Sequence, residues 1–277
     1  ACTSRWFLQL TKRIVLNSWR TRRHLPTKLW LCDSHTNTLM KPEYSIRVLH
    51  HLNEMQQLQA CTDLVWGPGT GNMVSADFLM ALSHAGGYVS GAFTSTDAGE
   101  EMVACSFGML AQHRGDWCLH SHITGVLPTL QNSGLGTAMK NHQKQWALDA
   151  GLTAITWTFD PLVRRNAWFN IERLGANAVE FHINFYGPLN DEINDDDETD
   201  RLLARWNIDS PRARTTDSDA IFIETPEDIV QLRRTDPEAA RAWRLKIRHE
   251  LSKAFTTHEV TGFTSKGSYT LTPRGKT

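Results

Sequence analysis

The chain lacks the sequence features that mark several protein classes. It contains no run of about 18 consecutive apolar residues, so we expect no transmembrane helix. Its five cysteines form no C-x-x-C pair, which argues against both a disulfide framework and a zinc site. This cysteine usage fits a reducing, cytoplasmic setting. The formal net charge is -1 and no stretch interleaves aromatic with basic residues, so we expect no nucleic acid and no membrane as partner.

The remaining composition is that of an ordinary globular protein. The 277 residues are 40% hydrophobic and 21% charged, enough for one large domain or two small ones. Residues 1–39 differ from the rest, because they hold seven Lys or Arg, a single acid and no clear period. We expect residues 1–40 to be a leader outside the fold, disordered or non-native, with a targeting segment as the alternative. Met40-Lys41-Pro42 resembles a natural start.

From residue 41 onward, strand and helix patterns alternate. The patterns predict a strand at 44–49, helices at 51–66 and 76–84, and strands at 88–94, 102–112 and 117–127. A glycine turn then leads into a helix at 134–150, a strand at 153–159, a helix at 165–174 and a strand at 179–185. Short connections predict an antiparallel meander, whereas the helix after 117–127 requires a parallel pair. The expected fold class is α/β of the α+β type, with a mixed, mostly antiparallel central sheet and helices on both faces.

The C-terminal part is expected to be an extension of this core. We expect a core over 41–190 and an extension over 191–277 that packs on it as strand, two helices and hairpin. The acidic residues at 191–198 predict a solvated loop. Pro226 and Pro237 are expected at the first positions of the two helices. The arginines at 241, 244 and 248 are expected to be solvent-exposed, with the acidic loop or an acidic substrate as alternative partners.

The glycine turn carries the functional signal. A helix N-terminus presents unpaired amides and a partial positive charge, which favour a phosphate. Gly134 and Gly136 lack a Cβ and permit close approach, and Ser133 and Thr137 add hydroxyl groups. The alternatives are a tight turn without a ligand and a dinucleotide site. The second is weakened because Met139 stands where that fingerprint needs its third glycine.

Two segments resemble the GNAT superfamily of acyl-CoA N-acyltransferases. Gln131-Asn132-Ser133-Gly134-Leu135-Gly136 resembles its Q/R-x-x-G-x-G/A signature, and the strand before it is similar to the family's fourth strand. Residues 166–176 resemble its N-A…L-G segment, and the order of elements over 44–186 is similar to its plan. The downstream residues resemble a poorly characterised predicted subgroup with a C-terminal extension.

The resemblance implies a binding mode. Acetyl-CoA or another acyl-CoA, with no metal, would lie where two parallel strands splay apart. The amides of 133–137 would hold the pyrophosphate, the edge of 123–126 would pair with pantetheine, and the Val126 amide would face the oxyanion. The implied cofactor-binding residues are Ile123, Gly125, Val126, Gln131, Asn132, Ser133, Gly134, Leu135, Gly136, Thr137 and Asn166.

The catalytic groups are harder to assign. Many family members carry a tyrosine acid where this chain has Ile171, so we expect either Tyr186 as a substitute or a thiolate that leaves unassisted. Strand alternation would place His120, His122 and Thr124 on one face, which makes His122 the candidate base. Glu180 and His182 are weaker candidates. Each of these residues also has a purely structural alternative.

The expected function is direct acyl transfer from CoA to an amine, most simply an acetyl transfer. The acceptor would be a small-molecule amine or a peptide. A non-catalytic acyl-CoA-binding regulator on the same fold is the alternative, and a dinucleotide-dependent enzyme is a third class. A homodimer is one open option.

Overall fold

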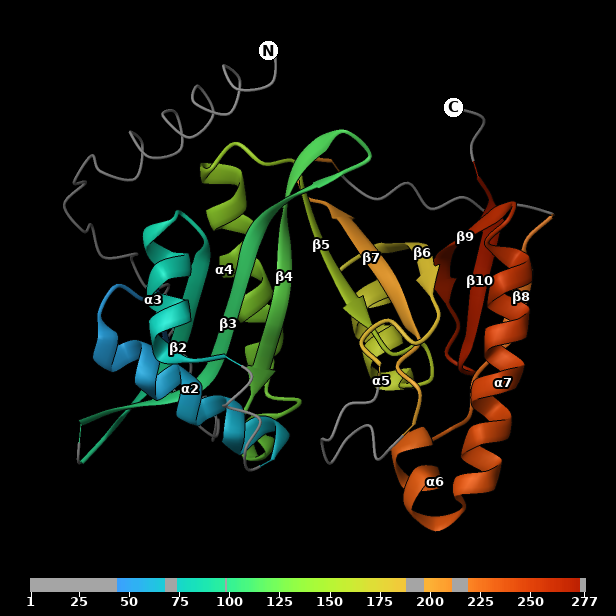
Figure 1. The fold of residues 1–277 in the computed structure, drawn as a ribbon, viewed down its shortest axis with the longest axis horizontal. Helices are drawn as coiled ribbons and strands as arrows, with labels where there is room; N and C mark the ends of the chain where they lie inside the picture. The colour runs from blue at the N-terminus through green and yellow to red at the C-terminus, as the bar shows by residue number, and fades with distance from the viewer. Residues whose placement is uncertain (1–43, 68–73, 98, 188–196, 211–218, 275–277) are drawn as a thin grey trace, which may run out of the picture.

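One sheet runs through the whole described part of the chain. The computed structural model describes residues 44–67, 74–97, 99–187, 197–210 and 219–274, so the expected leader and most of the acidic run lie outside them. The ten strands follow the order β1-β2-β3-β4-β5-β7-β6-β9-β10-β8. In Figure 1, α2 and α3 lie in front of one half of the sheet and α7 in front of the other, while α4 and α5 lie behind it. The mixed sheet with helices on both faces is therefore confirmed.

The first half forms as expected. Its elements are β1 (Ser45–Val48), α2 (Leu52–Trp66), α3 (Ala76–His84), β2 (Tyr88–Thr96), β3 (Gly99–His113) and β4 (Asp116–Val126). Strands β1 to β4 pair antiparallel in sequence order, which confirms the meander. Helix α2 buries Met55, Leu58 and Cys61, whose spacing of three places them on the face toward the sheet.

The parallel pair is short, and the two strands diverge. Helix α4 (Leu135–Asp149) connects β4 to β5 (Ala154–Phe159). These strands pair only at Leu119↔Ile155 and His120↔Thr156. Strand β4 continues to Val126 without β5 beside it, which leaves its edge unpaired by that neighbour. We call the space that opens between β4 and β5, beginning just after His120 and Thr156, the fork.

The second crossover differs from the expectation in two ways. Helix α5 (Arg164–Ala167) continues as the π-helix η3 (Trp168–Arg173), a wide turn of the kind that often marks functional sites. Strand β6 (Asn177–His182) ends earlier than expected, because the chain turns through Asn184 at φ 46. Strand β7 (Arg201–Asn207) then inserts between β5 and β6.

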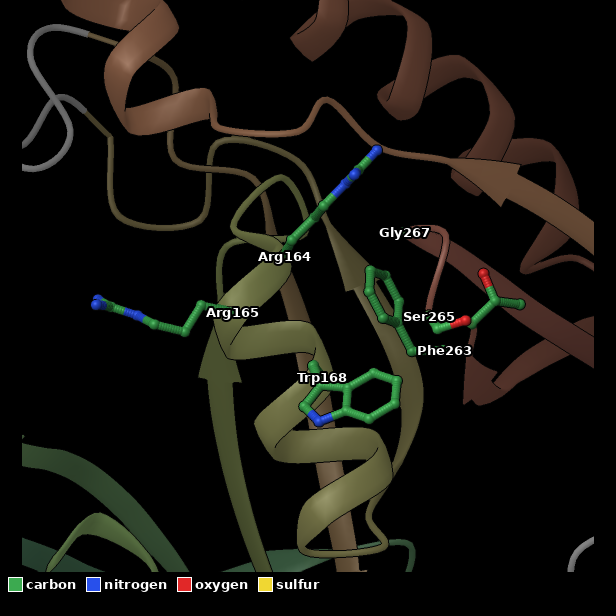
Figure 2. Close-up of a pocket in the computed structure, with 7 residues that line it drawn as sticks. Arg164, Arg165, Trp168, Phe263, Ser265 and Gly267 are labelled. Carbon is green, nitrogen blue, oxygen red and sulfur yellow. The ribbon is translucent and has the colours of Figure 1, made fainter. Parts of the chain in front are cut away.

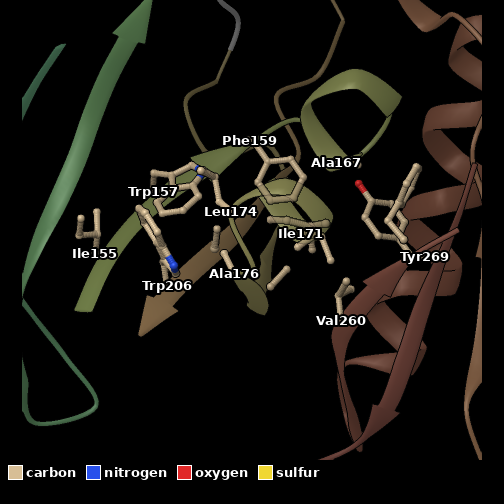
Figure 3. Packing of buried hydrophobic residues seen from close by; sticks show 14 of the residues in the cluster. Ile155, Trp157, Phe159, Ala167, Ile171, Leu174, Ala176, Trp206, Val260 and Tyr269 are labelled. Carbon is tan, nitrogen blue, oxygen red and sulfur yellow. The ribbon is translucent and has the colours of Figure 1, made fainter. Parts of the chain in front are cut away.

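A single hydrophobic core joins the central and C-terminal strands. Figure 3 shows Trp157 of β5 against Trp206 of β7, with their rings 6.4 Å apart and perpendicular. Ile171 of η3 is fully buried beside them. Tyr269 of β10 belongs to the same cluster and donates a hydrogen bond from its hydroxyl to the carbonyl of Pro161 at 2.7 Å. The hairpin therefore completes the core on this side.

The C-terminal elements are β8 (Ile221–Glu224), α6 (Ile229–Thr235), α7 (Pro237–Ala254), β9 (His258–Phe263) and β10 (Ser268–Pro273). Pro237 opens α7 as expected, but α6 starts later than Pro226. The reason is that Asp228 caps it by accepting from the amide of Gln231 at 2.9 Å. The boundary at residue 190 stays a prediction, although β7 pairs with strands from before it.

The expectation of exposed arginines on α7 is wrong for two of the three. Arg244 is 1% exposed and binds Asp160 and Asp197. Arg248 binds Asp200 and Glu198, each at 2.8 Å. Charge pairing with the end of the acidic run outweighs hydration, while Arg241 does stay exposed. None of the helices in the described part combines the length and apolar composition needed to cross a membrane.

Candidate active site

The glycine turn forms a sharp entry into α4. The 3-10 helix η2 (Pro128–Leu130) follows β4 and leads into it. Asn132 and Gly134 have φ values of 65 and 94, in the left-handed region. Space is open where a Cβ on Gly134 would stand, so this glycine is required by its backbone and not by packing.

The start of α4 presents free amides. The amide of Ala138 is the first to bond within the helix, to the carbonyl of Gly134 at 3.1 Å. The amide of Leu135 is partly satisfied by the Ser133 hydroxyl at 3.3 Å, and the amide of Ser133 bonds to Leu130. Among the described residues, the amides of Gly134, Gly136 and Thr137 have no hydrogen-bond partner. Three converging donors at the positive end of a 15-residue helix suit an anionic oxygen cluster.

A cation lies beside this loop. Arg165 of α5 donates from Nη1 to Oε1 of Gln131 at 2.8 Å, which ties the loop to the next crossover. No sequence motif singles out Arg165, and its only signal is its place next to Asn166. Asn166 itself is exposed on α5. The loop, Arg165 and Asn166 thus lie on neighbouring parts of one surface.

A cavity of about 270 Å³ lies on the other side of α5, against the C-terminal hairpin. In Figure 2, Arg164 and Trp168 lie on the side of the hairpin, and Arg165 points away from it. Arg164 donates to the hydroxyl of Thr225 at 3.0 Å, so it secures the extension. The cavity lining is Arg164, Arg165, Trp168, Phe263, Thr264, Ser265 and Gly267.

A β-bulge in β4 changes which side chains share a face. Phe107 pairs with Ile123 but Gly108 pairs with Ser121, so His122 is the extra residue. The hydroxyls of Ser121 and Thr124 therefore lie 3.4 Å apart on the face toward α4. His122 lies on the opposite face, with its ring 5.4 Å from that of Phe107. The expectation that Thr124 shares a face with His122 is wrong, because the bulge interrupts the alternation.

The backbone of β4 offers hydrogen-bonding groups to the fork. The amide of Leu127 bonds to the carbonyl of Val103 on β3 at 3.0 Å. Because amides alternate along an antiparallel pair, those of Ile123 and Gly125 also turn toward β3, and those of Thr124 and Val126 turn toward the fork. Gly125 has a packing role, since a Cβ there would lie 2.4 Å from the ring of Trp66. Contacts of Ile123 and Gly125 with a ligand stay a prediction.

Two imidazoles lie on the face that carries α2 and α3. His120 Nδ1 is 3.1 Å from the hydroxyl of Thr156, directly at the fork. Burial lowers the pKa of His120 to about 4, helped by the nearby His122 and Lys140. Burial also lowers the pKa of the more exposed His122. Both rings are therefore neutral at pH 7 and able to accept a proton.

The other predicted catalytic residues are placed differently. The hydroxyl of Tyr186 is 2.8 Å from that of Thr158, which shares the face of Thr156 two residues further along β5. Glu180 lies on β6, with its carboxylate oxygens 2.9 Å from Nε2 of His113 and 3.2 Å from Nε2 of His182. Strand β7 separates β6 from β5, so the structure does not bring Glu180 to His122.

One residue at the fork was missed. Lys140 of α4 is 4% exposed, and its Nζ donates to the hydroxyl of Ser121 at 2.9 Å and to Oε1 of Gln143 at 3.0 Å. Burial lowers the pKa of Lys140 to about 7. The available signal was its helical spacing, because Leu135, Met139 and Gln143 mark the inner face of α4. Among the described residues, no cluster of His, Cys, Asp or Glu could hold a metal ion.

Comparison with known proteins finds similarity in solved structures alone. No family model matches the chain, and no curated protein sequence matches it. The ribosomal-protein-S18-alanine N-acetyltransferase from Escherichia coli is 14% identical, covers 63% of this chain and 98% of its own, and has a TM-score of 0.46. The ribosomal-protein-S5-alanine acetyltransferase from Vibrio fischeri is 13% identical, covers 61% of this chain and 96% of its own, and has a TM-score of 0.47. Arabidopsis thaliana Naa50, solved with a bisubstrate analogue, is 16% identical, covers 58% of this chain and 97% of its own, and has a TM-score of 0.43.

Matches at these TM-scores carry no argument about chemistry. The chain's own elements define its fold: β1 through β6 follow in the expected order, with a glycine turn after β4 and one splayed parallel pair. The GNAT-type fold that the sequence resemblance implied is thereby confirmed.

Proposed function

We propose that this protein is an acyl-CoA-dependent N-acyltransferase that passes an acyl group, most simply acetyl, directly from CoA to an amine. The observation that carries the proposal is the position of the free amides at the start of α4. They follow the end of β4, and a Cβ on Gly136 would lie 3.9 Å from Val126, so a diphosphate bound to them would direct its extended arm along the β4 edge that β5 leaves unpaired.

The residues present fit such a ligand. The amides of Gly134, Gly136 and Thr137 would bind the diphosphate oxygens, with Arg165 as a nearby cation. The outward amides of Thr124 and Val126 would pair with the pantetheine arm in the manner of an added strand. Asn166 would contact the same arm. The acyl end would then reach the fork beside His120 and Thr156.

The chemistry follows from these positions. The amine nitrogen attacks the thioester carbonyl, and an outward amide, that of Val126 in our assignment, stabilises the resulting oxyanion. His122 takes a proton from the nitrogen, since it is the more exposed of the two imidazoles. The C–S bond then breaks, giving an amide and CoA. Thr158 and Tyr186 would line the side of the fork from which the acceptor approaches. The acceptor is a small-molecule or peptide amine.

One structural observation disfavours the dinucleotide alternative. That function would need a free carboxylate after β5 for a ribose hydroxyl, and Asp160 is the residue at that position. Asp160 is 7% exposed and is bound by both Arg233 and Arg244. Its oxygens are thus engaged within the protein.

Calorimetric titration tests the proposal. We expect CoA and acetyl-CoA to bind and NAD not to bind. Acetyl-CoA with a panel of amines and short peptides should then release free thiol in proportion to added protein. Binding without turnover on any acceptor would favour the non-catalytic regulator, and a failure of CoA to bind would reject both functions.

A further inference from the structure

A buried amine lies at the closed end of the fork. Ser121 and Trp157 are the first residues of β4 and β5 after the last parallel pair. Lys140 Nζ bridges them, 2.9 Å from the Ser121 hydroxyl and 4.2 Å from the centre of the Trp157 ring. The amine therefore forms the floor of the fork on the face toward α4, opposite to His120.

The environment of this amine does not balance a positive charge. Its hydrogen-bond partners, Ser121 and Gln143, are neutral, and within the described residues no carboxylate pairs with it. A buried ammonium without an anion is costly, and such groups concentrate at functional sites. A ligand that develops negative charge in the fork would supply the missing partner.

The reaction proposed above produces such a charge. When the C–S bond breaks, the electron pair stays on sulfur and a thiolate forms. The arm that carries it would run from the start of α4 toward the fork, where Lys140 forms the floor. The side chain that replaces the family's tyrosine acid, Ile171, is fully buried in the core and has no proton to give.

We propose that Lys140 is the acid of the reaction: its ammonium pairs with the departing CoA thiolate and transfers one proton from Nζ to sulfur. The products of this step are the CoA thiol and a neutral amine, which regains its proton from water before the next cycle. This assignment rests on the proposed function. It places base and acid on opposite faces of the sheet, with His122 on the face of α2 and Lys140 on the face of α4.

The protonation of the amine supports this role. Burial lowers the pKa of Lys140 to about 7, so the ammonium and the amine are both populated near neutral pH. Shifted pKa values are found for six other titratable groups on the elements around it: Tyr88 on β2, Cys105 on β3, Cys118, His120 and His122 on β4, and His142 on α4. Lys144 on α4 is a further cation. Strand β5 presents Trp157 on this face, and its ring does not titrate.

The test is the ionisation of bound CoA. The thiolate absorbs in the near ultraviolet, so its fraction can be followed against pH with CoA saturated by wild-type protein, Lys140→Met or Lys144→Met. Lys144 is the matched control, one turn further along α4 and over the ring of Trp206. Near pH 7, where about half of the molecules hold the Lys140 ammonium, we expect wild type and Lys144→Met to raise the thiolate fraction of bound CoA about fivefold over that of free CoA, because the ammonium lowers the thiol pKa by about one unit in that half. Lys140→Met should lose this gain.

Two results would overturn the assignment: a thiolate fraction of wild-type-bound CoA near pH 7 equal to that of free CoA, or the same gain in Lys140→Met. The first needs no variant. Met is expected to fold there, because it removes a buried charge and keeps the volume; if it does not, Lys140→Gln takes its place. CoA affinity is measured first by calorimetry, so that a lost site at the start of α4 is distinguished from a misassigned acid.

Discussion

The guanidinium of Arg244 and the carboxylate of Asp160 form two hydrogen bonds of 3.0 Å, although 84 residues separate them in the chain. Asp160 directly follows β5, and Arg244 lies on α7 of the extension. Arg233 and Asp197 complete a buried group of four charges. This group fastens the extension to the strand that forms one side of the fork.

Removal of one charge from this buried group should strongly destabilise the protein. We expect Arg244→Met to lower the free energy of unfolding by about 3–5 kcal/mol, because it removes one of the two arginines that hydrogen-bond both Asp160 and Asp197. Chemical denaturation followed by tryptophan fluorescence measures this change. Arg241→Met is the control on the same helix; Arg241 is exposed, so its variant should stay within about 0.5 kcal/mol of wild type. Equal effects of the two variants would contradict the finding.

The same cluster predicts sensitivity to acid. Burial alone would raise the pKa of Asp160, but Arg244 and Arg233 outweigh it and hold that pKa well below its usual range. Since the folded-state pKa is depressed, the stabilisation is complete above the unfolded-state pKa of about 4 and is lost as pH falls below it. Denaturation midpoints measured between pH 7 and pH 3 should decline steeply at the acidic end. In Asp160→Asn that dependence should flatten, even if the variant is less stable throughout.

A charge at the start of α4 should separate binding from folding. Gly136→Asp adds a carboxylate at the helix N-terminus, where the helix dipole stabilises a negative charge. A Cβ at this position would lie 3.9 Å from its nearest neighbours, so the side chain has room. We expect stability equal to or up to about 1 kcal/mol above wild type. Calorimetry should show a loss of CoA affinity of at least about tenfold, because a carboxylate beside the diphosphate is a like-charge contact. Gly136→Asn, which has the same size and no charge, should lose clearly less.

Removal of the proposed base should act on the rate. We expect His122→Gln to reduce kcat with acetyl-CoA and an accepted amine by about 100-fold or more, with a smaller change in KM for acetyl-CoA. In wild type, the acidic limb of the pH profile should lie below the ordinary imidazole pKa of about 6.5, since burial lowers the pKa of this imidazole. The acidic limb should disappear in the variant. His84→Gln, on α3, serves as the control for loss of a histidine.

Packing at Gly125 should be tight. A Cβ there would lie 2.4 Å from the ring of Trp66 and 3.0 Å from Val65, at the end of α2. We expect Gly125→Ala to destabilise the protein by about 1–3 kcal/mol through overpacking, read from thermal denaturation. The Cβ of Gly136→Ala would make only ordinary van der Waals contacts, so this variant should be about as stable as wild type. A harmless Gly125→Ala would mean that α2 shifts freely over β4.

Much of the fold could be predicted because local patterns and tertiary packing agree. The apolar spacing in α2, the cap at Asp236 before Pro237 and the glycine turn before α4 all favour the elements that form. The parallel pair followed from connectivity alone, since a helical crossover cannot join antiparallel neighbours directly.

The remainder depends on contacts that sequence spacing does not encode. The bulge at His122 arises where Gly108 lets the backbones of β3 and β4 approach, because a Cβ on Gly108 would lie 2.6 Å from the carbonyl of His120. The burial of Arg244 and the position of Lys140 at the fork are likewise tertiary facts. A lysine on a mostly polar helix is ordinary until the neighbouring strands are known.

The pairing of β9 with β6, through Ala178↔Val260, has a consequence for self-association. It covers the side of β6 that β7 leaves free, so that strand cannot recruit an edge from another molecule. Within the described residues the sheet instead ends at β1 and β8, which are four residues each. Short terminal strands are poor templates for intermolecular hydrogen bonding, so the extension protects the protein against edge-to-edge aggregation.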